Sequence, residues 1–244
     1  MADSVEEMKK QMLYEGKAKT VFATDDPEQV IVYFKDDATA FNGKKKSRIQ
    51  RKGEINNTLS SLLYRYLEEN DVKTHFLEQL SPRDMLVKSV RIIPLEVIVR
   101  NVAAGSMAKK LGVEEGRVLV KPIVEYSFKK DELGDPMLSE DHIIALGWAS
   151  EEQVAAIRQQ ALRINDLLKT VMEKAGLRLV DFKLEFGTSQ GEMLLADEIS
   201  PDTCRLWDLQ TNEKMDKDRF RRDLGKVTEH YQEVLERVMK ALDV

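Results

Sequence analysis

Hydrophobic and charged residues alternate in one stretch of the chain, VDFKLEFG (180–187). This period of two predicts a β-strand with one apolar face and one ionic face, and the ionic face carries Asp181, Lys183 and Glu185. A second alternating run, LLADEIS (194–200), follows shortly afterwards and contains two more carboxylates. Together the two runs predict a β-hairpin that gathers several charges on one surface.

The length of the hairpin loop decides which carboxylates meet on that surface. A loop of three or five residues places Asp197 on the face of Asp181 and Glu185, and a four-residue loop places Glu198 there instead. Neighbouring carboxylates repel one another, so a solvated face gains nothing from collecting them. Mg²⁺ with bound phosphates would reverse this, because it takes oxygen ligands and commonly binds one or two carboxylates. The alternative is an exposed strand face whose charges have no common role.

The rest of the pattern arranges strands and helices in blocks. Strands are expected in QMLYEG, KTVFAT and VIVYFKD, and later in MLVKSVRI and LEVIVRN. Helices are expected near 53–69, from Ser106 to Gly112, from Ser150 to Gly176, and at about 217–242. Ser150 can form a capping box with Gln153, whereas 116–147 shows no regular pattern. Such blocks favour an α+β fold with two lobes and a cleft between them.

Composition narrows the class of protein. The chain has 244 residues, of which 42% are hydrophobic and 33% charged, a balance typical of globular proteins. A net charge of −5 argues against a general nucleic-acid binder, and no apolar run approaches the roughly 20 residues that span a bilayer. The N-terminal residues lack the apolar segment of a signal peptide, so a cytoplasmic location without membrane attachment is expected.

The supply of metal ligands is also limited. Cys204 is the only cysteine, and the three histidines are far apart in the sequence. A zinc site is therefore not expected, and any metal should be a hard cation held by carboxylates. We expect Cys204 to be a small buried thiol, because no base stands near it in the sequence to activate it.

The segment YEGKAKTVF (14–22) is a candidate phosphate-binding turn. Gly16 and Ala18 leave the backbone unobstructed between two short strands, while Lys17 and Lys19 supply positive charge. Amides and a lysine in such a turn can face phosphate oxygens. An ordinary hairpin turn is the alternative, because a single glycine with nearby lysines is a weak signal.

Two further segments offer arginines. In VIVRNVAAGSMAKKLG (97–112), Arg100 ends a β-rich run and Ser106 starts a helix, an arrangement that suits an anion site. An N-cap serine and a surface arginine would give the same pattern. In ISPDTCRLWD (199–208), Arg205 can return toward the ionic face after the turn at Pro201.

These segments, taken in order, resemble the SAICAR synthetase (phosphoribosylaminoimidazole-succinocarboxamide synthase) family. The resemblance rests on YEGKAKTVF, RKGEINN, VRNVAAGS, VDFKLEFG, LLADEISPDTCRLWD and DKDRFRRDLG and extends from about residue 12 to 240. It implies a purine-biosynthesis ligase that joins carboxyaminoimidazole ribonucleotide and L-aspartate, with ATP as a substrate and Mg²⁺ as cofactor. Two rival functions remain: another Mg²⁺-dependent ATP ligase or kinase, and a non-catalytic nucleotide-binding regulatory module.

The resemblance also implies roles for individual residues. The ATP-binding residues would be Gly16, Lys17, Ala18, Lys19 and Lys88. The magnesium ligands would be Glu185 and Asp197, which selects the odd-length hairpin loop. The substrate-binding residues would be Arg100, Ser106, Asp181, Lys183, Arg205, Asn42, Lys129 and Arg221. Of these sets, the catalytic residues would be Lys183, Asp181 and Lys17.

The fold that the resemblance implies has two lobes. Residues 1–88 would form a mostly antiparallel β lobe that covers the nucleotide, and residues 89–244 a larger α+β, ATP-grasp-like lobe with the magnesium and substrate sites. Bacterial members of the family are commonly homodimers, so a homodimer is expected.

Overall fold

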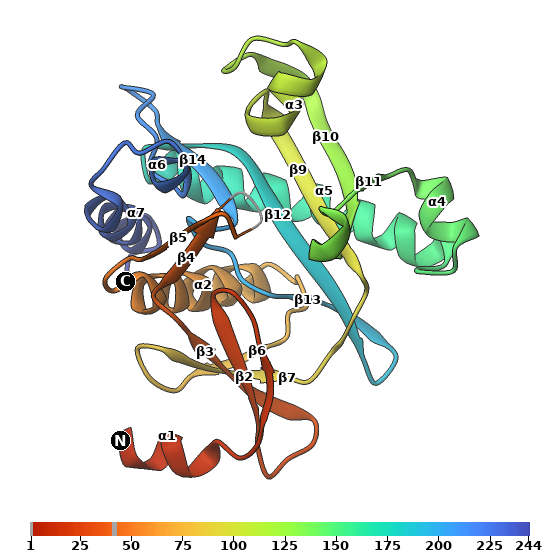
Figure 1. Ribbon diagram of the computed structural model, residues 1–244, viewed down its shortest axis with the longest axis vertical. Helices are drawn as coiled ribbons and strands as arrows, with labels where there is room; N and C mark the ends of the chain where they lie inside the picture. The colour runs from red at the N-terminus through yellow and green to blue at the C-terminus, as the bar shows by residue number, and fades with distance from the viewer. Residues whose placement is uncertain (1, 41–42) are drawn as a thin grey trace.

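The computed structural model describes residues 2–40 and 43–244 and has the mixed α+β architecture expected from the sequence (Figure 1). Within these residues the strands form two larger sheets and one two-stranded ribbon, and the named strands pair in antiparallel fashion. None of the helices in this part of the chain combines the length and hydrophobicity that a bilayer span requires.

The N-terminal sheet has five strands in the order β1-β2-β3-β7-β6. They are β1 (Met12–Glu15), β2 (Lys19–Ala23), β3 (Gln29–Phe34), β6 (Phe76–Gln79) and β7 (Asp84–Lys88). The first three are the strands expected near the N-terminus. The ribbon of β4 (Asp37–Ala40) and β5 (Lys45–Arg48) leads into α2 (Lys52–Glu69), the helix expected near 53–69, and α1 (Ala2–Met8), which was not expected, precedes β1.

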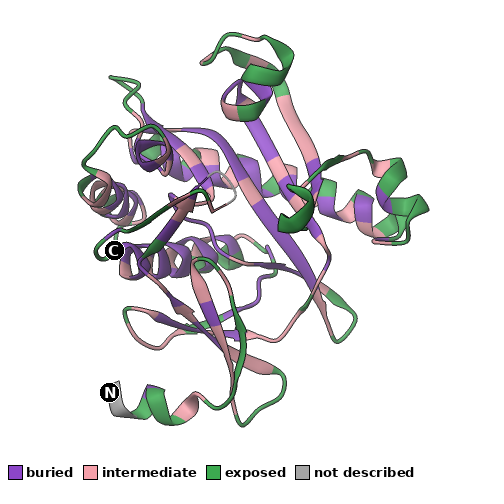
Figure 2. Ribbon diagram, in the orientation of Figure 1, coloured by how far each residue is buried: buried purple, intermediate pink, exposed green. Residues whose placement is uncertain are grey.

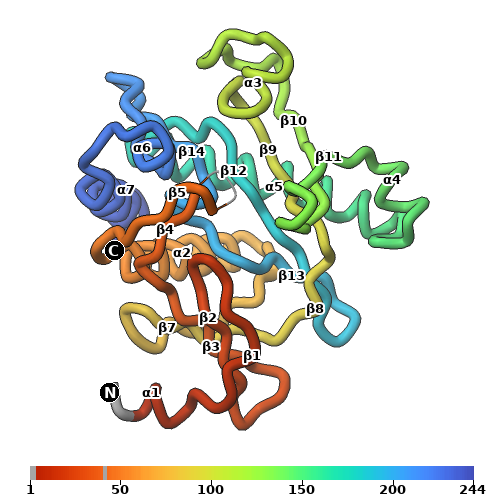
Figure 3. Tube along the Cα trace, viewed as in Figure 1, coloured from red at the N-terminus to blue at the C-terminus, as the bar shows by residue number. Residues whose placement is uncertain are grey.

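The second sheet has seven strands and is centred on one long strand. Its order is β11-β10-β9-β12-β13, and β8 and β14 also pair with β12. The strands are β8 (Arg91–Ile92), β9 (Leu95–Val102), β10 (Val118–Phe128), β11 (Met137–Leu138), β12 (Leu177–Ser189), β13 (Glu192–Ala196) and β14 (Cys204–Asp208). β8 lies beside the β12–β13 hairpin, where Ile92 pairs with Gly187 (Figure 3). β12 thus pairs with four other strands. Its ionic face, with Asp181 and Glu185, therefore lies in the interior of the molecule.

Helices cover the apolar sides of both sheets. Besides α1 and α2, the helices of the described residues are α3 (Gly105–Leu111), α4 (Glu140–Ala145), α5 (Glu151–Lys174), α6 (Asp218–Arg221), α7 (Val227–Ala241) and the short 3₁₀-helix η1 (Asp131–Leu133). α5 packs on β9, β10 and β12, and α2 packs on the N-terminal sheet and against α7. Figure 2 shows that α2 and most of β12 are buried, whereas α4 and the tip beyond α3 are exposed. One apolar cluster spans residues of both sheets, so they share a core.

The start of α5 confirms a local prediction. The Ser150 side chain accepts a hydrogen bond from the Gln153 amide, and the Gln153 side chain accepts one from the Ser150 amide. Gly176, with φ of 70°, follows the helix and reverses the chain into β12. Both signals are local, which is why they could be identified from the sequence.

Two expectations about the elements were wrong. The helix expected at 217–242 is divided into α6 and α7, because Gly225 and Lys226 both have positive φ and break the helix. The segment 116–147 is not irregular throughout but contains the long strand β10. Pro122 interrupts its alternation, and the pairing with β9 shifts register between Val118 and Ile123. A proline is tolerated in a strand at such an irregularity. The segment is therefore a strand because it pairs with β9, although its own sequence shows no regular alternation.

The β12–β13 hairpin has a register that the sequence interpretation did not choose. Glu185 pairs with Ala196 and Ser189 pairs with Glu192, which leaves a two-residue loop. Gln190 and Gly191 in this loop both have positive φ, as a tight hairpin turn requires. The odd-length loop selected by the family resemblance is therefore wrong, and strict alternation would place Glu198 rather than Asp197 beside Glu185.

Candidate active site

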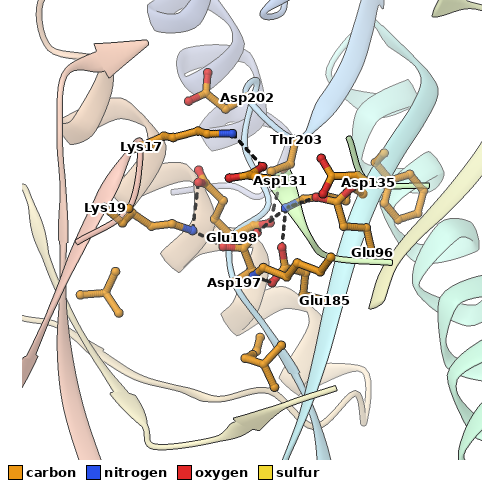
Figure 4. Close-up of a pocket in the computed structure, with 18 of the residues that line it drawn as sticks. Lys17, Lys19, Glu96, Asp131, Asp135, Glu185, Asp197, Glu198, Asp202 and Thr203 are labelled. Atoms are coloured by element: carbon orange, nitrogen blue, oxygen red, sulfur yellow. Dashed lines mark hydrogen bonds and ion pairs between the residues drawn. The ribbon is translucent and has the colours of Figure 1, made fainter. Parts of the chain in front are cut away.

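A cavity of about 910 Å³ is lined by residues of both sheets. The N-terminal sheet contributes apolar side chains to it, among them Val21, Val32 and Val87. The second sheet contributes the ionic face of β12, of which Glu185 is labelled in Figure 4. The cavity therefore combines an apolar part, suited to a planar base, with a strongly charged part.

The two carboxylates on the ionic face of β12 are buried and not in bulk water. Asp181 and Glu185 are only 3% and 2% exposed, while Phe182 and Leu184 on the opposite face belong to the core that α5 covers. Strand pairing places Arg100 of β9 beside Asp181. A buried charge is costly unless it is paired, so this face needs opposite charges close by.

Asp197 reaches the same cavity through an unusual backbone conformation. β13 ends at Ala196, and Asp197 has φ of 65°, in the left-handed region. This turn breaks the alternation of the strand, so that both Asp197 and Glu198 line the cavity with Glu185. The metal ligand expected from the resemblance is thus in the cavity, although for a reason other than the predicted register.

The carboxylates of this cluster are paired with lysines from three segments. Lys183 lies 2.6 Å from Glu185 and 2.9 Å from Asp197. Lys19 of β2 pairs with Asp197 and lies 3.1 Å from Glu198, and Lys129 pairs with Glu185. The charges therefore neutralise one another without a ligand.

The pKa values of this cluster follow from the pairing. Burial alone would lower the pKa of Lys19, but the negative charges of Asp197 and Glu198 outweigh it and raise that pKa. Burial would raise the pKa of Asp197, but Lys183 and Lys19 hold it well below its usual value. Lys19 and Asp197 are thus both charged near neutral pH. A charged pair of this kind can exchange its internal partners for an anionic ligand and a cation.

Two arginines frame the other end of the ionic face. Arg100 donates to Asp181 at 2.7 Å and to Glu125 at 2.7 Å, and its remaining nitrogen lies 3.4 Å from the Ser106 hydroxyl. Arg205 donates to both oxygens of Asp181, at 3.1 and 3.0 Å. Each arginine is fixed by carboxylates yet lines the cavity, as expected for a rigid anion-binding wall.

Gly105 is required for this arrangement of arginines. It has φ of 56°, and a Cβ atom at this position would collide with the guanidinium of Arg205. The small residues before Ser106 therefore let Arg205 lie against the start of α3.

The structure brings the predicted site residues together. Those that line the cavity are Gly16, Lys17, Ala18, Lys19, Lys88, Arg100, Ser106, Lys129, Asp181, Lys183, Glu185, Asp197, Arg205 and Arg221. Asn42 lies outside the described residues, and the neighbouring Gly43 lines the cavity. Their shared location agrees with one site, and the individual roles stay predictions.

Several ionisable residues of the cavity were not identified from the sequence. Glu96 lies on the same face of β9 as Arg100, a period-of-two signal that could have been recognised, and burial raises its pKa. His75 gave no signal, because it reaches the cavity through tertiary packing; burial and Lys19 lower its pKa to about 3. Asp131 of η1 pairs with Lys17 at 2.7 Å across the cavity, and Lys217 lines the wall near Arg221.

The donor set suits a hard cation bound through a nucleotide. The described residues contain no group of three or more histidine, cysteine or acidic side chains arranged to hold a metal by themselves. Glu185 and Asp197 can supply two carboxylates, and Mg²⁺ commonly takes one or two carboxylates and completes its shell with phosphate oxygens and water. Cys204 is buried, as expected, and burial raises the pKa of its thiol, which makes it a poor nucleophile.

Comparisons with known proteins agree on one family. The family model described as SAICAR synthetase matches residues 12–238. The phosphoribosylaminoimidazole-succinocarboxamide synthase of Clostridium acetobutylicum is 57% identical over 230 residues, which cover 94% of this chain and 98% of that protein. The crystal structure of the Ehrlichia chaffeensis enzyme of the same name superposes with a TM-score of 0.92 at 47% identity and covers 93% of this chain and 98% of that one. A SAICAR synthetase solved in complex with ADP gives a TM-score of 0.90 at 48% identity, covering 93% of this chain and 97% of that one.

Proposed function

The chain belongs to the SAICAR synthetase family, and on this premise we propose that it joins carboxyaminoimidazole ribonucleotide to L-aspartate with ATP, giving SAICAR, ADP and phosphate. A match over nearly the whole chain, with relatives above 50% identity that carry the enzyme's name, favours this over the two rival functions. The reaction is an ATP-dependent ligation in purine biosynthesis.

One observation supports the proposal most strongly: a single cavity holds a lysine–carboxylate cluster beside a wall of arginines. A carboxylate is a poor acylating agent because its oxygen is a poor leaving group. Phosphorylation by ATP turns that oxygen into a good leaving group, and the aspartate amine then displaces phosphate. The enzyme's main tasks are therefore to align anionic molecules and to neutralise their charge.

The residues divide these tasks by position. Lys17 and Lys19, on and beside the turn between β1 and β2, face the nucleotide phosphates, and the apolar side chains of the N-terminal sheet take the adenine. Arg100, Ser106 and Arg205 bind the ribonucleotide phosphate. Lys183, held between Glu185 and Asp197, stabilises the charge that moves from ATP to the substrate carboxylate.

Mg²⁺ would be held by Glu185 and Asp197. When bound, it supplies positive charge that offsets the phosphate oxygens during transfer. Because both carboxylates are paired with lysines in the structure, ligand binding exchanges one set of charge partners for another.

A coupled assay of ADP release tests the proposal. ADP should appear only when the ribonucleotide, L-aspartate, ATP and magnesium are all present. Equal turnover with another amino acid, or with no amine, would indicate a different ligase or kinase. Tight ATP binding without turnover under saturating conditions would indicate the regulatory module instead.

Three finer statements belong to the same proposal. Residues 1–88 form the lobe that covers the nucleotide and 89–244 the lobe that binds magnesium and the substrates. The protein works as a homodimer, which light scattering coupled to size exclusion would test. It acts in the cytoplasm, which fractionation of the source cells would test.

A further inference from the structure

Lys217 lines the cavity, and none of the described carboxylates forms an ion pair with it. It stands directly before α6, and its backbone amide donates to the Pro201 carbonyl at 3.0 Å, which fixes it beside the turn that follows β13. Apart from Lys88, every other lysine and arginine lining the cavity in the described part of the chain forms an ion pair. Lys217 is therefore a cationic side chain in the site that forms no direct ion pair with any residue the structure describes.

The acidic side chain with the largest electrostatic effect on Lys217 is already engaged elsewhere. Asp202 lies 2.7 Å from the ammonium of Lys52 through one oxygen, and its other oxygen accepts from the Tyr231 hydroxyl at 2.7 Å. Lys52 is 1% exposed, so this pair is a rigid buried support. Both Asp202 oxygens thus already accept hydrogen bonds, no ion pair joins Asp202 to Lys217, and Lys217 lines the cavity.

Arg221 adds a second cation on the same side. Its amide donates to the Lys217 carbonyl at 3.0 Å, so the two residues lie one helical turn apart, and both line the cavity. Like charges at this spacing repel each other unless an anion lies between them. Arg221 uses one terminal nitrogen to bind Asp218 at 2.8 Å, and no hydrogen bond to a described residue occupies its other donors.

We propose that Lys217, with Arg221 beside it, binds a carboxylate of the amino-acid substrate. The inference rests on the proposed function, in which the amine donor is a short dicarboxylic amino acid. The other ligands already have cations: Lys17 and Lys19 for the nucleotide, and Arg100 and Arg205 for the ribonucleotide phosphate. A dicarboxylate is the remaining anion.

The surroundings of Lys217 agree with this role. Burial lowers its pKa, and the positive charges of Arg221 and Lys52 act in the same direction, while Asp202 and Glu198 offset only part of this. A bound carboxylate would offset both effects, because it supplies a direct ion-pair partner. A carboxylate that loses a charge-assisted hydrogen bond in a partly buried site typically loses about 1.5–3 kcal/mol of binding, which corresponds to roughly a 10- to 100-fold weaker affinity.

Steady-state kinetics of Lys217→Met, Lys217→Arg and a matched control test the proposal. Lys217→Met should raise the KM for L-aspartate by about 10- to 100-fold and leave the KM values for ATP and the ribonucleotide near wild type. Succinate, a dicarboxylate that has no amine, should inhibit the wild type in competition with aspartate and lose affinity by the same factor. Lys217→Arg keeps the charge and should recover most of both affinities.

Lys214→Met is the control, because Lys214 is a partly buried lysine that packs over the Trp207 ring outside the cavity. It should keep the wild-type KM for aspartate. If Lys217→Met does not fold, as judged by thermal unfolding, Lys217→Gln takes its place.

An unchanged KM for aspartate, or a rise only in the KM for the ribonucleotide, would overturn the inference. So would a fall in kcat alone, since that would indicate a role in proton transfer. A wild-type enzyme that does not turn over with aspartate would instead refute the proposed function, so the two failures can be told apart.

Discussion

Tyr64→Phe should weaken the site although Tyr64 itself does not line the cavity. Tyr64 of α2 is fully buried, and its hydroxyl donates to the Ala196 carbonyl at 3.0 Å, directly before Asp197. Burial raises the pKa of Tyr64 well above its usual value, so the hydroxyl remains a donor at any working pH. The ring packs on His75 and Phe76, contacts that phenylalanine would keep. The substitution therefore removes one hydrogen bond and little else.

The expected magnitude follows from that single contact. A buried carbonyl left without its donor costs about 1–3 kcal/mol of unfolding free energy. For a chain of this size, each kcal/mol corresponds to about 2–4 °C in Tm, so a fall of roughly 2–12 °C is expected. Asp197, which has a left-handed backbone conformation, directly follows the Ala196 carbonyl that loses its donor. Removing a group that holds a metal ligand in position typically costs about 10- to 100-fold in metal affinity or activity. We expect magnesium-dependent ADP binding to weaken roughly tenfold or more.

Urea unfolding and calorimetric titration of ADP with and without magnesium measure the two effects. Ser61→Ala is the matched control, because Ser61 lies on the same helix, is buried, and has a hydroxyl with no hydrogen-bond partner among the described residues. It should leave ADP binding unchanged. The reasoning would be refuted if Tyr64→Phe bound magnesium and ADP like the wild type, or if both variants weakened binding equally.

Three further predictions follow from other contacts. Glu185→Gln removes a carboxylate of similar volume and should lower turnover by roughly two orders of magnitude or more; near-normal activity at saturating magnesium would exclude Glu185 as a metal ligand. Arg100→Met should chiefly raise the KM for the ribonucleotide. An effect on the KM for ATP alone would show that Arg100 binds ATP and not the ribonucleotide phosphate. Asp216 is buried, and burial and Asp218 raise its pKa from 3.8 to about 7. The folded protein therefore keeps a proton that the unfolded chain loses, so this group's contribution to stability is complete below about pH 4 and is lost as the pH rises through about 7. Asp216→Asn should flatten the pH dependence of the unfolding free energy between these values, and an unchanged slope in urea titrations would contradict the raised pKa.

The sequence predicted those features that depend on neighbouring residues. The capping box at Ser150 and the ionic face of β12 were both correct, because each depends on residues within one turn or one strand. Asp197 does line the cavity with Glu185, but the register from which this was expected was wrong, and its role as a metal ligand stays a prediction. Only the left-handed backbone at Asp197, supported by Tyr64 from a distant helix, explains its position.

Residues that reach the site through tertiary contacts could not be identified in this way. Lys217 can be recognised as a cation without an ion pair only once the contacts of the neighbouring Asp202 are known. Asp202 binds Lys52 and Tyr231, which come from two different helices. His75 likewise enters the cavity because its segment bridges to β13, where its amide donates to the Leu195 carbonyl at 2.8 Å. Neither arrangement leaves a periodic signal in the sequence.

The central claim is that Glu185 and Asp197, brought together by β12 and the turn after β13, jointly hold a nucleotide-bound cation. A crystal structure with ADP and Mn²⁺ in place of Mg²⁺ tests it most directly, because anomalous scattering locates the ion. We predict an ion bonded to both carboxylates at about 2.1 Å and to the nucleotide phosphates, with Lys19 and Lys183 moved from Asp197 toward phosphate oxygens. An ion bound elsewhere, with both carboxylates still paired only with lysines, would contradict the claim.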